Sequence, residues 1–211
     1  MTPASVAKEA LQAIRDRLVA AGFRKRASER YTRSIDGDVL GWMGLQRAAR
    51  PGGAVAIAPT VGVHHPVVER LVHEFTETEG KPGITVTLAR PLGYLLPEPT
   101  WRQWVYSPRE SFDPVIDDMV DAIMRYGVPY MEANADLNAA AAERASIPGP
   151  PLEGPKRIGI IYALQGEKEE AMAALQPLFL QVENWSTGRA ESLRFLENFG
   201  KYFNVRVFGL D

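Results

Sequence analysis

The chain has 211 residues, of which 45% are hydrophobic, so it can bury a true core and is not disordered overall. It contains no cysteine, which excludes disulfides, thiolate metal sites and cysteine nucleophiles. The formal net charge is −2, but residues 1–50 carry 10 basic against 5 acidic side chains, whereas residues 111–155 carry 2 against 8.

The N-terminal part of the chain predicts one helix followed by three strands. Residues 3–21 repeat apolar side chains at helical spacing, and Gly22 is suited to end that helix. Residues 28–34, 39–47 and 54–63 have the composition of strands and are separated by short turn sequences. We therefore expect these strands to pair mainly in the antiparallel sense.

The third predicted strand, residues 54–63, has two unequal faces. One face carries bulky side chains such as Val61 and Val63, and the other carries only alanine, threonine and glycine. We expect a helix to pack closely on the small face, with a ligand pocket there as the alternative. Pro59 predicts a bulge or an edge position, because proline cannot donate a ladder hydrogen bond.

Residues 66–77 predict a further helix and residues 84–88 a fourth strand. The proline- and glycine-rich residues 146–155 read as a connector. We expect an α+β fold in which a domain of residues 1–145 forms a four-stranded, mainly antiparallel sheet packed with helices, and a helical extension, residues 156–211, packs on the same core. The remaining predicted helices are 113–126, 129–145, 158–165, 167–182 and 188–203.

The aromatic segment of residues 90–109 is the first candidate site. It contains four prolines together with Trp101, Arg102, Trp104 and Tyr106, and these residue types are enriched in binding hot spots. Prolines stiffen the segment, so it would lose little entropy on binding. The alternative is that this loop covers the protein's own sheet.

The three histidines, His64, His65 and His73, fall within ten residues and suggest a second candidate site. On one helix, His65, Glu69 and His73 would share a stripe and form a metal-competent set. His65 and His73 would, however, be separated by about 12 Å along the helix, too far for both to bind one ion directly. The alternative is that they are polar residues at the start and on the exposed face of a helix.

No other pattern predicts catalysis. The sequence contains no GxSxG nucleophile elbow, no Walker A loop and no GxGxxG fingerprint. Acidic clusters such as Asp117, Asp118 and Asp121 are typical of solvated helix faces. We therefore assign no catalytic residues and expect no cofactor.

Several short motifs resemble those of an uncharacterised bacterial domain family. They are Gly22-Phe23, the Arg30–Arg33 segment RYTR, Gly44-Leu45-Gln46 and the Val61–Val63 segment VGV. The resemblance covers roughly the first two-thirds of the chain. It implies an α+β fold of bacterial origin and supplies no catalytic residues.

These patterns together predict a non-catalytic protein that binds a partner protein, in the manner of an accessory or immunity protein that occludes its target. The rival hypothesis is a small metal-dependent or ligand-binding enzyme that uses the His64–His73 segment, with His65 and His73 as metal ligands. Nucleic-acid binding is disfavoured, because the basic cluster at residues 24–26 lacks an interleaved aromatic motif. No apolar run approaches the roughly 18 residues of a membrane span, and no signal peptide precedes residue 20, so we expect a cytoplasmic protein without a membrane partner. The oligomeric state is left open.

Overall fold

A computed structural model describes residues 3–78, 85–108, 111–146, 153–184 and 188–207. Its backbone divides into two compact units, and each is described by itself. Unit 1 comprises residues 1–64 and 88–135, and unit 2 comprises residues 65–87 and 136–211.

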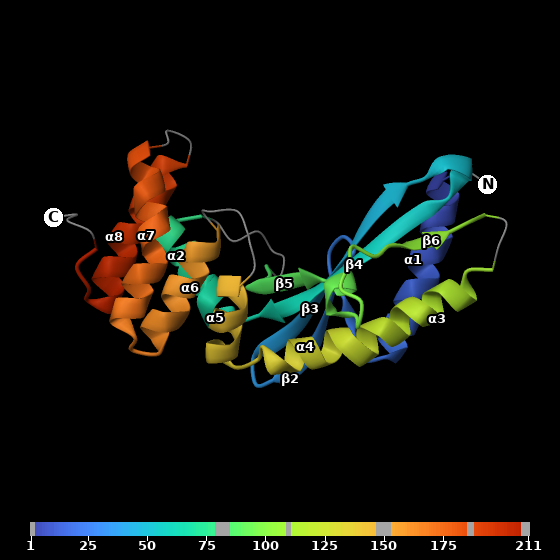
Figure 1. The fold of residues 1–211 in the computed structure, drawn as a ribbon, viewed down its shortest axis with the longest axis horizontal. Helices are drawn as coiled ribbons and strands as arrows, with labels where there is room; N and C mark the ends of the chain where they lie inside the picture. Colours follow the sequence, from blue (N-terminus) through green and yellow to red (C-terminus); the bar gives the residue numbers. More distant parts are fainter. Residues whose placement is uncertain (1–2, 79–84, 109–110, 147–152, 185–187, 208–211) are drawn as a thin grey trace. The chain divides into compact units, whose positions relative to one another are not determined.

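Unit 1 contains an antiparallel sheet in the order β1-β2-β3-β4-β5, with β6 as a further partner of β4 (Figure 1). The long central strands are β2, β3 and β4, which pair as successive hairpins. The α+β class and the antiparallel sheet are confirmed, and the sheet has two more short strands than we expected. The strands are β1 (Arg24–Lys25), β2 (Arg30–Asp36), β3 (Val39–Ala49), β4 (Val55–His64), β5 (Leu88–Pro91) and β6 (Trp104–Tyr106).

Pro59 lies inside β4 and pairs with Leu45 of β3 without a register shift. On the other side of β4, the residues paired with β6 end at Ile57 and those paired with β5 begin at Thr60. The proline therefore lies in a gap between two short partner strands. A residue without an N–H is tolerated there, so the expected bulge is not needed.

The helices of unit 1 are α1 (Pro3–Ala20), α3 (Asp113–Ala122) and α4 (Val128–Ala133). They cover the bulky face of the sheet. On that face Gly41 of β3 lies against Met131 of α4, and a Cβ on Gly41 would be 2.7 Å from the methionine sulfur. Tyr106, which is opposite Val55 on the same face, is fully buried and donates its hydroxyl to Met119 of α3 at 3.5 Å.

The contacts described above place helices of unit 1 on the bulky face, where the side chains supply more apolar surface to bury. On the small face of β4, Ala56 and Ala58 are buried, and our expectation that a helix packs there stays a prediction. Gly62, on this small face, has a different role. A Cβ on Gly62 would lie 1.9 Å from Leu88 O, so β5 bends over the small face and requires glycine at that point.

A π-helical turn, η3 (Ile123–Gly127), connects α3 and α4, and the three segments form one continuous helical rod (Figure 1). Gly127 at its end allows close packing, because a Cβ there would be 3.2 Å from Val61 Cγ1. The sequence predicted two separate helices here, residues 113–126 and 129–145, with a break at Gly127. Instead, the chain stays helical with one wider turn, which such bulges permit.

Unit 2 is a bundle of α2 (Pro66–Thr76), α5 (Leu137–Ser146), α6 (Glu153–Leu164), α7 (Lys168–Asn184) and α8 (Arg189–Phe203). Helix α2 packs on α6 and α8 (Figure 1). The rings of Phe75, Phe195 and Phe199 lie at the centre of the core, with centroids 5.7 to 6.1 Å apart. The predicted helical C-terminal part is confirmed.

The boundary between the units does not follow the expected division into residues 1–145 and 156–211. Helix α2 lies far before the 146–155 connector in sequence but belongs to unit 2, since its apolar residues Val68, Leu71 and Phe75 join the core of the C-terminal helices. The composition of residues 146–155 predicts a connector, but it carries no information on which helix an earlier segment will pack against. Residues 147–152 of the connector lie outside the described residues.

Candidate functional site

The aromatic segment forms a closed loop between β5 and β6. It begins with the short helix η2 (Leu92–Leu95), and Thr100 N–H donates to Gly93 O at 3.1 Å. The two ends of the loop touch closely, because a Cβ on Gly93 would lie 2.2 Å from Thr100 O and 2.7 Å from Arg102 N. Compact surface loops with joined ends are frequently functional. We call residues 92–106 the aromatic loop.

Four apolar side chains of the aromatic loop are buried and fix it to unit 1. Leu92 and Tyr106 are fully buried, and Leu96 and Trp104 are nearly so. Burying side chains of this size stabilises the attachment by about 1.5–3 kcal/mol each. The loop is therefore an ordered part of the fold.

Asp118 of α3 holds the second half of the aromatic loop. Its Oδ2 accepts hydrogen bonds from Arg102 Nη2 and from Trp104 Nε1, both at 2.6 Å. The guanidinium of Arg102 also lies 4.7 Å from the centre of the Trp104 ring. Gln103, between these two residues, accepts a hydrogen bond from Arg50. One carboxylate thus fixes both a buried indole and a surface arginine.

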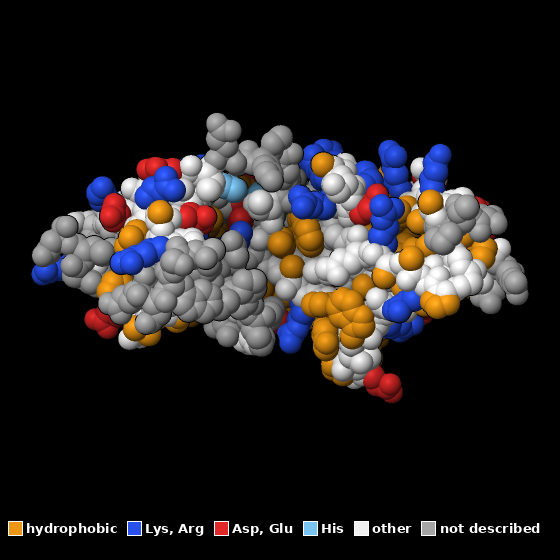
Figure 2. All heavy atoms as spheres, turned by 90° about the horizontal axis from the view of Figure 1, so that it is seen from above, with side chains coloured by type: hydrophobic (Ala, Val, Ile, Leu, Met, Phe, Trp, Pro, Cys, Tyr) orange, Lys and Arg blue, Asp and Glu red, His pale blue; other side chains and the backbone are white. Residues whose placement is uncertain are grey.

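Large apolar side chains of the same loop face outward. Tyr94 is 43% exposed, Trp101 47% and Val105 47%. Tyr94 and Trp101 are the chain neighbours of the joined residues Gly93, Thr100 and Arg102, so the loop closure brings their backbones near one another. In the space-filling view, hydrophobic side chains gather in patches between charged ones (Figure 2). Tryptophan normally buries most of its surface, so a tryptophan that is about half exposed on a fixed backbone is unusual.

A hollow of about 260 Å³ adjoins the aromatic loop. It is open to solvent, and its charged residues are Arg102, Asp118, Asp121 and Arg125. Since Arg102 pairs with Asp118, the lining holds one further carboxylate, of Asp121, and one further guanidinium, of Arg125. Such a mixed lining is typical of a polar rim beside an apolar contact.

The structure separates the four predicted binding residues into two groups. Trp101 and Arg102 are exposed, whereas Trp104 and Tyr106 are buried and pack within the fold. The sequence analysis missed Tyr94, Val105 and Asp118. Asp118 had no recognisable signal, because its two hydrogen-bond donors lie 14 and 16 residues away in the chain.

The histidine segment lies at the end of β4 and along α2. His64 ends β4, and His65 precedes the first helical residue and is buried, with its N–H donating to Thr87 Oγ1 at 3.0 Å. Glu69, the carboxylate between the two expected metal ligands, is bound by Arg157 of α6. The only carboxylate on the His65–His73 stripe is thus committed to a buried ion pair.

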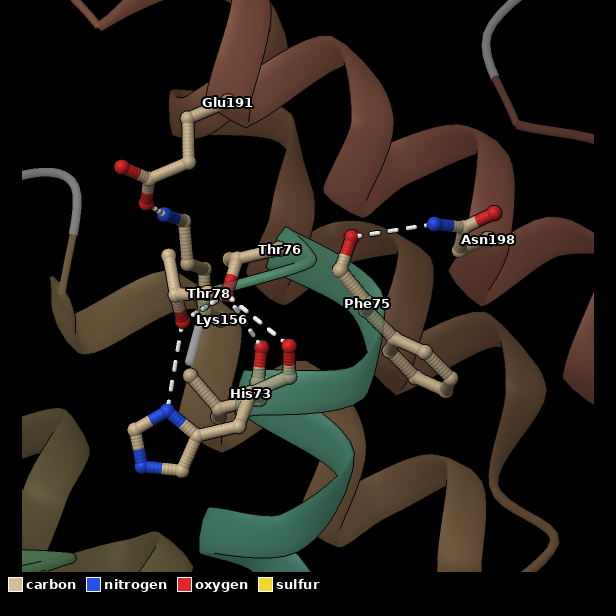
Figure 3. Close-up of polar contacts among 8 residues, drawn as sticks. His73, Phe75, Thr76, Thr78, Lys156, Glu191 and Asn198 are labelled. Atoms are coloured by element: carbon tan, nitrogen blue, oxygen red, sulfur yellow. Dashed lines mark hydrogen bonds and ion pairs between the residues drawn. The ribbon is translucent and has the colours of Figure 1, made fainter. Parts of the chain in front are cut away.

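His73 lies near the other end of α2, in a group of hydroxyl contacts (Figure 3). Its Nδ1 is 3.3 Å from Thr78 Oγ1, and Thr78 is 2.8 Å from the hydroxyl of Thr76. Thr76 donates to Val72 O at 2.7 Å. These contacts link the His73 ring to hydroxyl groups at the end of its own helix.

A hydrogen bond and an ion pair made by residues of α6 and α8 lie beside this end of α2 (Figure 3). Asn198 Nδ2 donates to Phe75 O at 3.1 Å, and Lys156 Nζ is 2.6 Å from Glu191 Oε1. Lys156 is 2% exposed, and its buried ammonium group is stabilised by the Glu191 carboxylate and by the nearby Phe195 ring. These contacts join α8 to α2 and α6 to α8, which is a structural role.

Within the described ranges, no three side chains of His, Cys, Asp or Glu are close enough to hold a metal ion. No helix in the same part of the chain is both long and apolar enough to cross a membrane. No protein-family model, no curated protein and no solved structure matches the chain.

Proposed function

We propose that this chain is a non-catalytic binding protein that docks a partner protein through the aromatic loop. The observation that carries the proposal is Trp101, which is 47% exposed on a backbone closed at Gly93 and fixed by Asp118. Rigid aromatic anchors bind with a small entropy cost, and tryptophan, tyrosine and arginine dominate interface hot spots. Trp101, Tyr94 and Arg102 supply these three residue types.

The partner expected from this surface is a folded protein with an apolar pocket for the indole, surrounded by charged groups. The hollow beside the loop offers Asp121 and Arg125 to such a rim, and rim charges contribute to association rate and specificity more than to affinity. In its narrowest form, the proposal is an accessory or immunity-type protein that occludes a functional site of the partner. In the histidine segment, Glu69 pairs with Arg157 and His73 lies beside Thr78, and no observation there favours a second function.

The proposal is tested by position-dependent crosslinking in the producing cell. A photoreactive phenylalanine analogue replaces Trp101 or Tyr94, and the control places it at Val19, which is 50% exposed on α1. We expect one discrete crosslinked product at the two loop positions and none at the control. Equal products at all three positions, or none at the loop, would contradict the proposal.

The purified complex supplies a second measurement. Trp101→Ala is expected to weaken binding by about 2 kcal/mol, which is roughly thirtyfold, whereas Val19→Ala leaves the affinity unchanged. A Trp101→Ala protein that binds as tightly as the parent would show that the loop is not the docking surface.

A further inference from the structure

The small face of the unit 1 sheet has an arrangement of side chains that the sequence alone does not show, with some members buried, such as Thr32, and others exposed, such as Arg30. The register places Arg24, Thr32, Trp42 and Gly62 in one row across β1, β2, β3 and β4. These residues lie on the small face, opposite the helices. A parallel row places Arg30 beside Gly44 and Thr60.

Trp42 is the largest side chain in these two rows, is partly buried, and has glycines beside it. The six-membered ring of the indole lies over Gly44, where a Cβ would be 2.7 Å from Trp42 Cη2. Thr60 and Gly62, beside these two residues on β4, are also small. A hollow of about 220 Å³ therefore lies against the indole, and its polar lining residues are Ser28, Glu29, Arg30, Gln46 and Thr60.

Three exposed arginines, Arg24, Arg26 and Arg30, lie on β1, β2 and the turn between them, and of these Arg30 lines the same hollow as the indole. Arg24 is opposite Thr32, Arg26 Nε donates to Thr32 Oγ1 at 2.9 Å, and Arg26 N–H donates to Arg30 O at 2.8 Å. Glu29, the carboxylate in the hollow, lies 3.3 Å from Lys25 Nζ and is compensated. The edge of the face is consequently cationic.

We propose that this face binds single-stranded nucleic acid, with a base stacked on Trp42 and phosphates held by Arg24, Arg26 and Arg30. Stacking on an aromatic side chain over an open sheet, next to a cationic path for the backbone, is how single strands are commonly bound. Gln46, Ser28 and Thr60 offer donors and acceptors to a base edge. A duplex presents no unstacked base to the indole.

This site is independent of the aromatic loop, since it lies on other strands and uses none of the same residues. The sequence analysis disfavoured nucleic acid because no aromatic residue interleaves the 24–26 cluster. Strand pairing supplies that aromatic residue from β3, 16 to 18 positions further along the chain.

The test measures fluorescence anisotropy of labelled oligouridylate with the full chain at about 50 and 200 mM salt. Variants are Trp42→Leu, Trp42→Phe, and a triple change of Arg24, Arg26 and Arg30 to glutamine. The matched control changes three exposed helix arginines of unit 2, Arg70, Arg189 and Arg194, to glutamine. Circular dichroism melts verify that each variant is folded.

We expect Trp42→Leu to weaken binding at least tenfold with little change in salt dependence, and Trp42→Phe to restore most of it. The triple change at the sheet should flatten the salt slope by about 2, given roughly 0.7 per phosphate contact for single strands, while the control triple leaves the slope unchanged. Lack of binding at low salt, equal binding of a duplex, or equal loss in the control triple would overturn the proposal. Equally effective competition by polyglutamate would overturn it in favour of an acidic peptide.

Discussion

The carboxylate of Glu69 and the guanidinium of Arg157 form a buried bidentate pair between α2 and α6. Arg157 Nε donates to Oε1 at 2.8 Å and Nη2 donates to Oε2 at 2.9 Å. The side chain of Glu69 is 3% exposed and that of Arg157 is 11% exposed. Burial alone would raise the pKa of Glu69, but the hydrogen bond and charge of Arg157, together with the hydroxyls of Thr87 and Thr85, outweigh it and lower the pKa.

Removing one member of this pair is expected to destabilise the protein strongly. Arg157→Met leaves a buried carboxylate without its cation and should lower the free energy of unfolding by about 3–5 kcal/mol. The matched control is Arg70→Met on α2, the helix that carries Glu69, because Arg70 and its partner Glu74 are mostly exposed and the expected loss is below about 1 kcal/mol. Urea denaturation monitored by circular dichroism measures the free energy of unfolding of both variants. Equal losses would show that the buried pair contributes no more to stability than the exposed pair.

The lowered pKa of Glu69 predicts how stability depends on acid. Because the folded-state pKa lies below the ordinary value of 4.5, the pair stabilises the fold above that pH and loses its contribution as the pH falls below it. Glu69→Gln should be less stable at neutral pH and show a shallower decline between neutral and acid conditions. Urea midpoints at a series of pH values give the comparison, and parallel curves for the two proteins would contradict the assignment.

Tyr31 predicts the opposite kind of change. Its hydroxyl is buried without a hydrogen-bond partner among the described residues, and burial raises its pKa to about 12. Tyr31→Phe removes an unsatisfied polar group, so the free energy of unfolding should stay the same or rise by about 1 kcal/mol.

Alkaline titration supplies the check on Tyr31. Ionisation favours the unfolded chain, so the parent protein should lose stability as the pH rises from the ordinary value of 10.0 toward 12, and Tyr31→Phe should lose less. The second buried phenol, Tyr106, remains in both proteins and is the internal reference. A Tyr31→Phe protein that is markedly less stable at neutral pH would mean that the hydroxyl has a partner.

Gly93→Ala tests the closure of the aromatic loop. The added Cβ would lie 2.2 Å from Thr100 O, a backbone atom that cannot rotate away, so we expect a loss of about 1–3 kcal/mol and an opened loop. Hydrogen exchange of Thr100 N–H should accelerate, while exchange in the β3–β4 ladder stays slow. Unchanged protection of Thr100 would show that the loop does not depend on this contact.

Local periodicity predicted the parts of the fold that are long and regular. The alternation of residues 54–63 identified β4 with its two unequal faces, and Pro66 correctly marked the start of α2. The two-residue strand β1 and the three-residue strand β6 have too few positions for any periodicity to show. Their pairing depends on neighbours distant in sequence.

The candidate site was less predictable, for a physical reason. Trp101 and Trp104 are three residues apart with similar composition around them, yet one is 47% exposed and the other 3%. The difference comes from strand β6, which turns Trp104 toward α3 and Asp118. Composition located the segment, whereas the direction of each ring is decided by tertiary pairing.

The wider turn at η3 determines which side chains of α4 face the sheet, relative to those of α3. A π-helical turn adds one residue to the repeat, which rotates everything after it by about 100° relative to a uniform α-helix. Met119 before the insertion and Met131 after it can thus both meet the strands, one at Tyr106 and the other at Gly41. Over the positions that separate Met119 and Met131, a uniform α-helix would turn Met131 about 120° away from Met119, whereas the extra residue leaves about 20°, so the two side chains share one face of the rod. The same sequence in a uniform α-helix would therefore swing Met131 off Gly41.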